Sequence, residues 1–380
     1  MSLKTLKTLE TLKPLPHSKP QNIKTSQPPS MKRLASLDIL RGFDLFLLLF
    51  VGPVVSSLAA VSDAEWTGTL AYHFDHAAWD GLRMWDLVMP LFMFMAGVSM
   101  PFALRKEVKG AGIWRRILKR VILLFILGMV VQGGLLTFNW ERFTLYTNTL
   151  QAIGFGYGIA AICLLTLSVR MHVLATLALL IIYAIPMMLV GDYTQEGNFA
   201  NLVDATVLGR FRGDPSYTWV WSTLTFAATT MLGALSGQLI RYKELSKQQI
   251  TLLLMGIGIL LLIGGYVWGE FLPINKRLWT SSMTLVTGGY CYLLLALFYY
   301  VIDVLEWSRG LEWLKWYGMN AIAAYMVGEC INFRSVVHSV SYGLQPYLGD
   351  YYNLFLTFGN SLVLLLILRW MYRNKIFWKV

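Results

Sequence analysis

His76 and Asp86 are the residues of this 380-residue chain best suited to chemistry. Asp86 leads directly into an apolar run long enough to span a bilayer, where an ionisable side chain costs several kcal/mol. Such a cost indicates a functional role. A histidine at the mouth of this run can act as a general base or carry an acyl group, because imidazole titrates near neutral pH.

The separation of the two residues gives a structural expectation. On one straight helix, Asp86 lies about three turns deeper than His76 and out of its reach. We therefore expect Asp86 to hold another helix in place, through Asn320 or Arg41. A lone histidine at a membrane interface is more often structural than catalytic, so the spacing alone leaves both roles open for His76.

A second charged group opens the first apolar segment. Asp38, Arg41 and Asp44 are spaced three apart, and therefore lie along one face of a helix. The planar guanidinium of Arg41 suits a phosphate group. The alternative is structural: Ser36 caps the helix, Asp38 sits favourably in its first turn, and the charges neutralise one another.

Polar and aromatic residues gather in the connections expected on the non-cytoplasmic side. Such side chains can stack on and hydrogen-bond a polar ligand such as a sugar. The alternative for each aromatic residue is an interfacial belt that only contacts lipid. The candidates from these connections are Trp79, Asp80, Asn275, Lys276 and Trp279.

Composition indicates an all-α polytopic membrane protein. Hydrophobic residues make up 56% of the chain and charged residues 14%, with a mean hydropathy of +0.54. The net charge of +11 does not indicate nucleic acid, since the basic residues fall in short loops between apolar runs. The three cysteines lie in apolar runs without metal-binding or disulfide spacing.

Apolar length predicts about ten transmembrane helices, with both termini cytoplasmic by the positive-inside rule. Residues 1–30 are rich in Lys, Pro, Ser and Thr and are predicted to be a disordered cytoplasmic tail, before a single membrane domain at 31–380. The predicted spans are 38–62, 83–104, 118–136, 148–168, 172–191, 218–240, 250–269, 281–303, 313–334 and 352–372.

Several segments together resemble the heparan-alpha-glucosaminide N-acetyltransferase family and its bacterial relatives. The two longest are RLASLDILRG at 33–42 and HAAWDGLRMWDLVMPLFMFMAG at 76–97. Shorter matches are LQAIG at 150–154, LGALSG at 232–237, PINKRLWT at 273–280, GMNAI at 318–322 and YRNKIFWKV at 372–380. Their order and spread make the resemblance more specific than one short motif.

The resemblance implies an acetyltransferase of a bacterial inner membrane. It would move an acetyl group from cytoplasmic acetyl-CoA to an amino sugar or other glycan on the periplasmic side, without a metal and without nucleic acid. His76 and Asp86 would be catalytic, and relatives imply a homodimer in the lipid bilayer. The expected contacts to CoA are Asp38, Arg41, Arg115, Lys119 and Arg120, and those to the acceptor are Trp79, Asp80, Asn275, Lys276, Trp279 and Asn320.

Two questions stay open at this point. His76 can act as a base in a ternary complex or as a transient acetyl carrier; we favour the base, because an exposed acetyl-imidazole would hydrolyse. A secondary transporter or flippase of a polar, glycan-related substrate is the alternative function. It would use Gly52-Pro53 and Met89-Pro90 as helix breaks, but no paired breaks in two halves of the chain support it.

Overall fold

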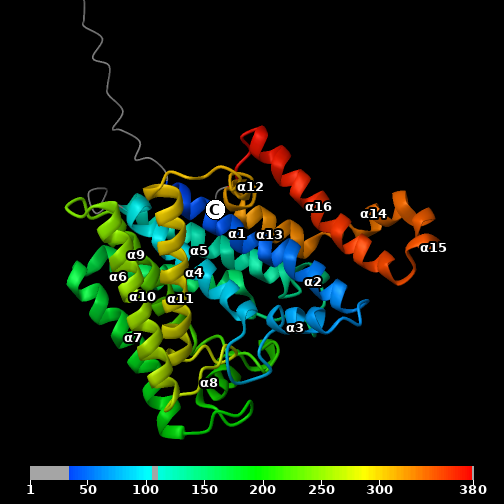
Figure 1. The fold of residues 1–380 in the computed structure, drawn as a ribbon. Helices are drawn as coiled ribbons and strands as arrows, with labels where there is room; N and C mark the ends of the chain where they lie inside the picture. Colours follow the sequence, from blue (N-terminus) through cyan, green and yellow to red (C-terminus); the bar gives the residue numbers. More distant parts are fainter. Residues whose placement is uncertain (1–33, 105–109, 379–380) are drawn as a thin grey trace, which may run out of the picture. The chain divides into compact units, whose positions relative to one another are not determined.

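The computed structural model describes residues 34–104 and 110–378, which form helices joined by short connections (Figure 1). Within these residues there is one isolated bridge, between Gly81 and Asn275, and no sheet. The predicted tail at 1–30 lies outside the described residues. The α-helices are α1 Ala35–Phe46, α2 Gly52–Ala59, α3 Glu65–His73, α4 Val88–Ala103, α5 Ala111–Val131, α6 Thr149–Thr166, α7 Val169–Val190, α8 Phe199–Leu208, α9 Thr223–Ile240, α10 Lys247–Gly269, α11 Ser281–Tyr299, α12 Leu314–Gly318, α13 Ala321–Cys330, α14 Arg334–Ser341, α15 Gln345–Leu348 and α16 Tyr352–Arg373.

Eight helical segments of the described chain are long and apolar enough to cross a membrane. The predicted all-α membrane architecture is therefore confirmed, while the count of ten is not. Two predicted spans fall short of these criteria. The one at 118–136 corresponds to α5, which carries a run of basic residues at its start, and the one at 313–334 corresponds to α12 and the short apolar α13.

Apolar side chains cover the outside of the peripheral helices. Leu260 of α10 is 70% exposed and Leu189 of α7 is 81% exposed, and similar residues repeat along both helices. Water would not stabilise so many exposed apolar side chains, whereas hydrocarbon would. This exposure agrees with an integral membrane protein.

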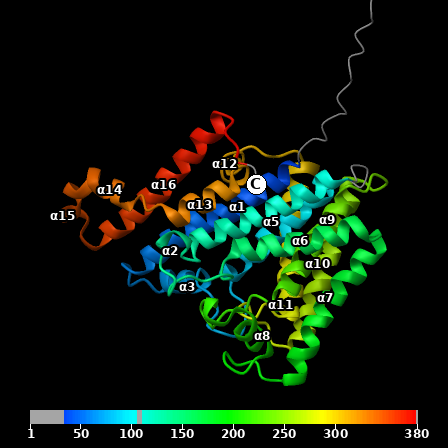
Figure 2. The ribbon, with the colours of Figure 1, turned by 180° about the vertical axis from the view of Figure 1, so that it is seen from behind.

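The centre of the bundle depends on close contact between α4 and α9. At its edge α10 and α11 lie side by side in both views (Figures 1 and 2). A Cβ at Gly97 of α4 would lie 2.0 Å from the carbonyl oxygen of Thr230. A Cβ at Gly233 of α9 would lie 2.0 Å from the carbonyl oxygen of Phe94. Only glycine permits this approach of the two backbones.

The start of α1 differs from the expected cap. Ser36 does not cap the helix; its backbone N–H instead donates to the carboxylate of Asp303, at 3.2 Å. The predicted stripe is confirmed in part, because Arg41 lies 3.7 Å from Asp38 one turn away. Asp44 is buried, and its Oδ2 has no hydrogen-bond partner.

Neither helix break proposed for a transporter is present. α1 continues through a π-helical turn at Leu47–Val51 into α2, so Gly52 and Pro53 do not interrupt the helix. Pro90 is the third residue of α4, where a missing N–H costs no intrahelical hydrogen bond. Gly52 instead makes room for Trp85, whose ring would lie 2.2 Å from a Cβ at that position.

Candidate active site

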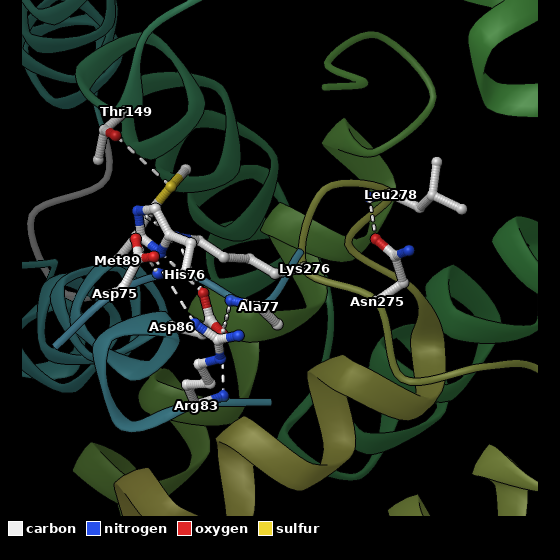
Figure 3. A network of polar contacts seen from close by, with 10 residues as sticks. All are labelled: Asp75, His76, Ala77, Arg83, Asp86, Met89, Thr149, Asn275, Lys276 and Leu278. Carbon is white, nitrogen blue, oxygen red and sulfur yellow. Dashed lines mark hydrogen bonds and ion pairs between the residues drawn. The ribbon is translucent and has the colours of Figure 1, made fainter. Parts of the chain in front are cut away.

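His76 and Asp86 are in direct contact. The Nδ1 atom of His76 lies 2.8 Å from Oδ1 of Asp86 (Figure 3). The expectation that Asp86 lies out of reach is wrong, because the helix does not begin until the short 3-10 turn Met84–Leu87. The residues before that turn form a loop that folds back and brings His76 onto the carboxylate.

The second oxygen of Asp86 fixes this loop. Oδ2 accepts the backbone N–H of Ala77 at 3.2 Å and that of Arg83 at 2.9 Å. The side chain is 1% exposed, and these contacts leave it little freedom to rotate. Asp86 thus both closes the loop and orients the imidazole, as the aspartate of a His–Asp pair does.

The expected partners of Asp86 are engaged elsewhere. Asn320 donates to the carbonyl of Ile376 at 3.1 Å and accepts from the backbone of Trp378 at 3.1 Å, so it anchors the C-terminal segment. Arg41 contacts Asp38. Asn320 is fully buried in this role and is not part of the group around His76.

A second loop, residues 273–280 between α10 and α11, completes the site. Gly81 donates to the carbonyl of Ile274 at 2.8 Å, and Asn275 Nδ2 lies 3.4 Å from Asp80 Oδ1. Asn275 also accepts from the backbone of Leu278 at 3.0 Å, which shapes the turn. The structure therefore brings together the predicted residues Asp80, Asn275 and Lys276.

Lys276 lies against the imidazole. Its Nζ is 2.8 Å from Nδ1 and 3.2 Å from Nε2 of His76, and 3.5 Å from Oδ1 of Asp86. The residue is 9% exposed. Burial lowers the pKa of Lys276 to about 8, although the carboxylate of Asp86 opposes this shift. Lys276 is therefore present both as the ammonium and as the neutral amine at pH values near neutrality.

The rim of the site contains residues that the sequence did not single out. Arg83 lies 3.6 Å from Asp75, and its guanidinium lies 3.8 Å above the ring of Tyr72 at the end of α3. Asp75 also accepts the backbone N–H of His76 at 2.8 Å. Asp75 adjoins the 76–97 motif and Arg83 lies within it. The motif was therefore the sequence feature from which both residues could have been predicted to lie at the site.

The two tryptophans predicted to contact the acceptor differ in exposure, because Trp279 is buried and Trp79 is partly exposed. The indole of Trp279 is 2% exposed, donates to Thr229 at 3.2 Å and meets Phe226 edge-on. Trp79 is half-buried and donates to the carbonyl of Tyr193 at 2.9 Å. The buried Trp279 ring cannot stack on a sugar in this arrangement, whereas stacking on the partly exposed Trp79 stays a prediction.

The residues expected to bind CoA lie in the first two turns of α1 and in the N-terminal half of α5, toward the end of the bundle opposite α3 and the 273–280 loop (Figure 1). Arg115 and Lys119 are exposed on α5. Arg120 lies with its guanidinium 4.4 Å above the ring of Tyr157. A common phosphate site between these residues and Arg41 stays a prediction.

Comparison with known proteins defines the family. The family model described as "Heparan-alpha-glucosaminide N-acetyltransferase, catalytic" matches residues 33–267, which include His76 and Asp86. The chain belongs to this family. The match confirms the resemblance noted from the sequence motifs.

Curated members of the heparan-alpha-glucosaminide N-acetyltransferase family match most of the chain. The proteins of that name from Mus musculus and Homo sapiens are each 23% identical to it, over 92% of its length. The chain spans 61% of the mouse protein and 60% of the human one. An alignment over 92% of the chain cannot end before Lys276, so both alignments extend past the family model and include the segment that contains this residue.

Proposed function

We propose that this protein is an integral membrane acetyltransferase that takes its acetyl group from acetyl-CoA. The acceptor is an amine or hydroxyl of an amino sugar or other glycan on the periplasmic face of a bacterial inner membrane. The observation that carries the proposal is the His76–Asp86 contact of 2.8 Å, within the region that matches the catalytic family model. A histidine oriented by a buried carboxylate is the arrangement that a general base requires.

The chemistry follows from the proton positions. His76 removes a proton from the acceptor as its nitrogen or oxygen attacks the thioester carbonyl. The carbon–sulfur bond then breaks, and the CoA thiolate takes the proton from the imidazolium. Asp86 stabilises the imidazolium during this step because its carboxylate lies 2.8 Å from Nδ1. The side chain of His76 is 36% exposed, so an acceptor can reach it.

Supporting polar groups surround this position. Asp75, Asp80 and Arg83 present carboxylates and a guanidinium at the rim, which suit the hydroxyl and amine groups of a sugar. The donor is proposed to enter from the opposite end, with its phosphates near Arg41, Arg115 and Lys119 and its thioester reaching His76 through the bundle. No observation favours the transporter, since both expected helix breaks are absent.

The test is acetyl transfer by purified protein to a panel of amino sugars, with acetyl-CoA affinity measured in parallel by calorimetry. His76→Ala should abolish transfer and keep the affinity, since the nucleotide is held about 30 Å away across the hydrocarbon core. Arg41→Ala should instead weaken the binding of acetyl-CoA measured by calorimetry. His73→Ala is the matched control, because His73 is an exposed histidine of the same outer region and should leave transfer unchanged.

Full acetyl transfer by His76→Ala would show that His76 is not the catalytic base.

An isotope-exchange measurement on the purified protein distinguishes the two possible roles of His76. A base in a ternary complex predicts no exchange of label between acetyl-CoA and free CoA without acceptor, whereas an acetyl-histidine requires that exchange. If the unchanged protein shows this exchange and His76→Ala does not, His76 acts as an acetyl carrier and not as a general base.

A further inference from the structure

The Nδ1 atom of His76 has two competing neighbours. Asp86 Oδ1 and Lys276 Nζ each lie 2.8 Å from it. A neutral imidazole carries one proton, on Nδ1 or on Nε2. Nδ1 can donate to Asp86 or accept from Lys276, but it cannot do both in the same state.

Each choice has a consequence for the other ring nitrogen. When the Lys276 ammonium donates to Nδ1, the single proton of the imidazole lies on Nε2, and that nitrogen cannot act as a base. The ammonium can also donate to Nε2, 3.2 Å away, while Nδ1 donates to Asp86, and the lone pair of Nε2 is then occupied. Only when Lys276 is neutral does Nδ1 donate to Asp86 with no ammonium engaging Nε2. A protonated Lys276 therefore prevents His76 from acting as a base through Nε2.

We infer that Lys276 is a positioning residue that sets the tautomer of His76, so that His76 is a competent base only when Lys276 has lost its proton. The inference deepens the proposed function, because it assigns control of the same site. It contrasts with the role of acceptor ligand that the sequence suggested for Lys276. The buried position of the amine, 9% exposed and within reach of both imidazole nitrogens, carries the argument.

The surroundings of Lys276 agree with a lysine that can change its charge. Asp86 favours the ammonium, whereas burial and the nearby Arg277 favour the neutral amine. His76 is the third group that faces it. With a pKa of about 8 for Lys276, roughly a tenth of the protein would hold the neutral amine at pH 7.

Carbethoxylation by diethyl pyrocarbonate tests the inference without any acetyl transfer, because the reagent attacks an accessible, unprotonated imidazole nitrogen. The rate at His76 is followed by peptide mass spectrometry between pH 6 and 9.5, with the exposed His73 as internal reference. In the unchanged protein the His76 rate should rise with a midpoint near 8, as Lys276 loses its proton.

Two substitutions should act in opposite directions. Lys276→Met removes the competing proton and should raise the His76 rate at pH 7 by up to about tenfold. Lys276→Arg keeps a permanent charge and should hold the rate low across the whole range. If Lys276 only supplied charge to a ligand or to the fold, the arginine variant would resemble the unchanged protein and the methionine variant would be impaired.

An unchanged His76 profile in Lys276→Met overturns the inference, as does a faster rate in Lys276→Arg than in Lys276→Met. If the arginine variant fails to fold, the methionine variant decides alone. Acetyl transfer is measured on the same samples and should follow the His76 rate. If carbethoxylation behaves as expected but no acetyl transfer occurs, the control by Lys276 stands and the proposed function fails.

Discussion

At the residue scale, one carboxylate performs two tasks in this site. Asp86 contacts His76 through Oδ1 and holds two backbone N–H groups through Oδ2. A carboxamide has nearly the same shape, but it can present an N–H to the imidazole and cannot stabilise an imidazolium in the same way. The charge of Asp86, rather than its shape, is therefore expected to support the reaction.

Asp86→Asn should lower acetyl transfer by about a hundredfold or more, within the range for loss of general-base catalysis. Acetyl-CoA affinity should remain, since the donor phosphates are proposed to bind elsewhere. Kinetics and calorimetry on the same preparation check both statements. Asp350→Asn, at an exposed site between α15 and α16, should behave like the unchanged protein. Full activity of Asp86→Asn would show that His76 works without this carboxylate.

At the element scale, the site depends on how three helices meet around Trp85. Its ring packs against Gly52 at the start of α2 and lies 5.5 Å from the ring of Phe74 at the end of α3. The neighbouring residue is Asp86, so the position of this ring is coupled to the position of the carboxylate. The packing of α2 against the 3-10 turn is therefore part of the support for the site.

Gly52→Ala should displace Trp85, because the added Cβ would lie 2.2 Å from its ring. We expect about 1–3 kcal/mol of destabilisation, typical of overpacking, together with reduced acetyl transfer. Gly68→Ala in α3 is the matched control, since no atom lies within 4 Å of its added Cβ. Thermal unfolding in detergent and transfer assays should separate the two variants; equal behaviour would contradict the packing argument.

At the scale of the whole molecule, the proposed reaction requires that the two ends of the bundle face different compartments. α10 runs from Lys247 to Gly269, and 23 helical residues extend about 35 Å, enough to cross the hydrocarbon core. Lys243 precedes this helix and Glu270 follows it, and both are exposed. The positive-inside rule predicts that Lys243 lies on the cytoplasmic side.

An impermeant maleimide applied to sealed cells should label Glu270→Cys and not Lys243→Cys. The background must lack the native cysteines, since Cys330 is exposed and would react itself. Lysed cells supply the control, because both positions should then be labelled. Labelling of Lys243→Cys in sealed cells would reverse the orientation and place His76 on the cytoplasmic side.

The sequence by itself determined the class of the protein and pointed to the residues of the candidate site. Hydropathy is a local property that reports burial in lipid directly, so the helical membrane architecture followed from composition and run length. His76, Asp86 and Lys276 stood out because charged groups are rare beside apolar spans, and because their segments resemble one family.

Only the tertiary structure decided how those residues meet. His76 and Lys276 are 200 residues apart, and their contact depends on how two loops fold onto each other. Periodicity could not show that the loop before Met84 reverses, which made Asp86 look too distant. It also could not separate a buried indole such as Trp279 from an exposed one, because burial in a bundle is set by helix packing, which local patterns do not encode.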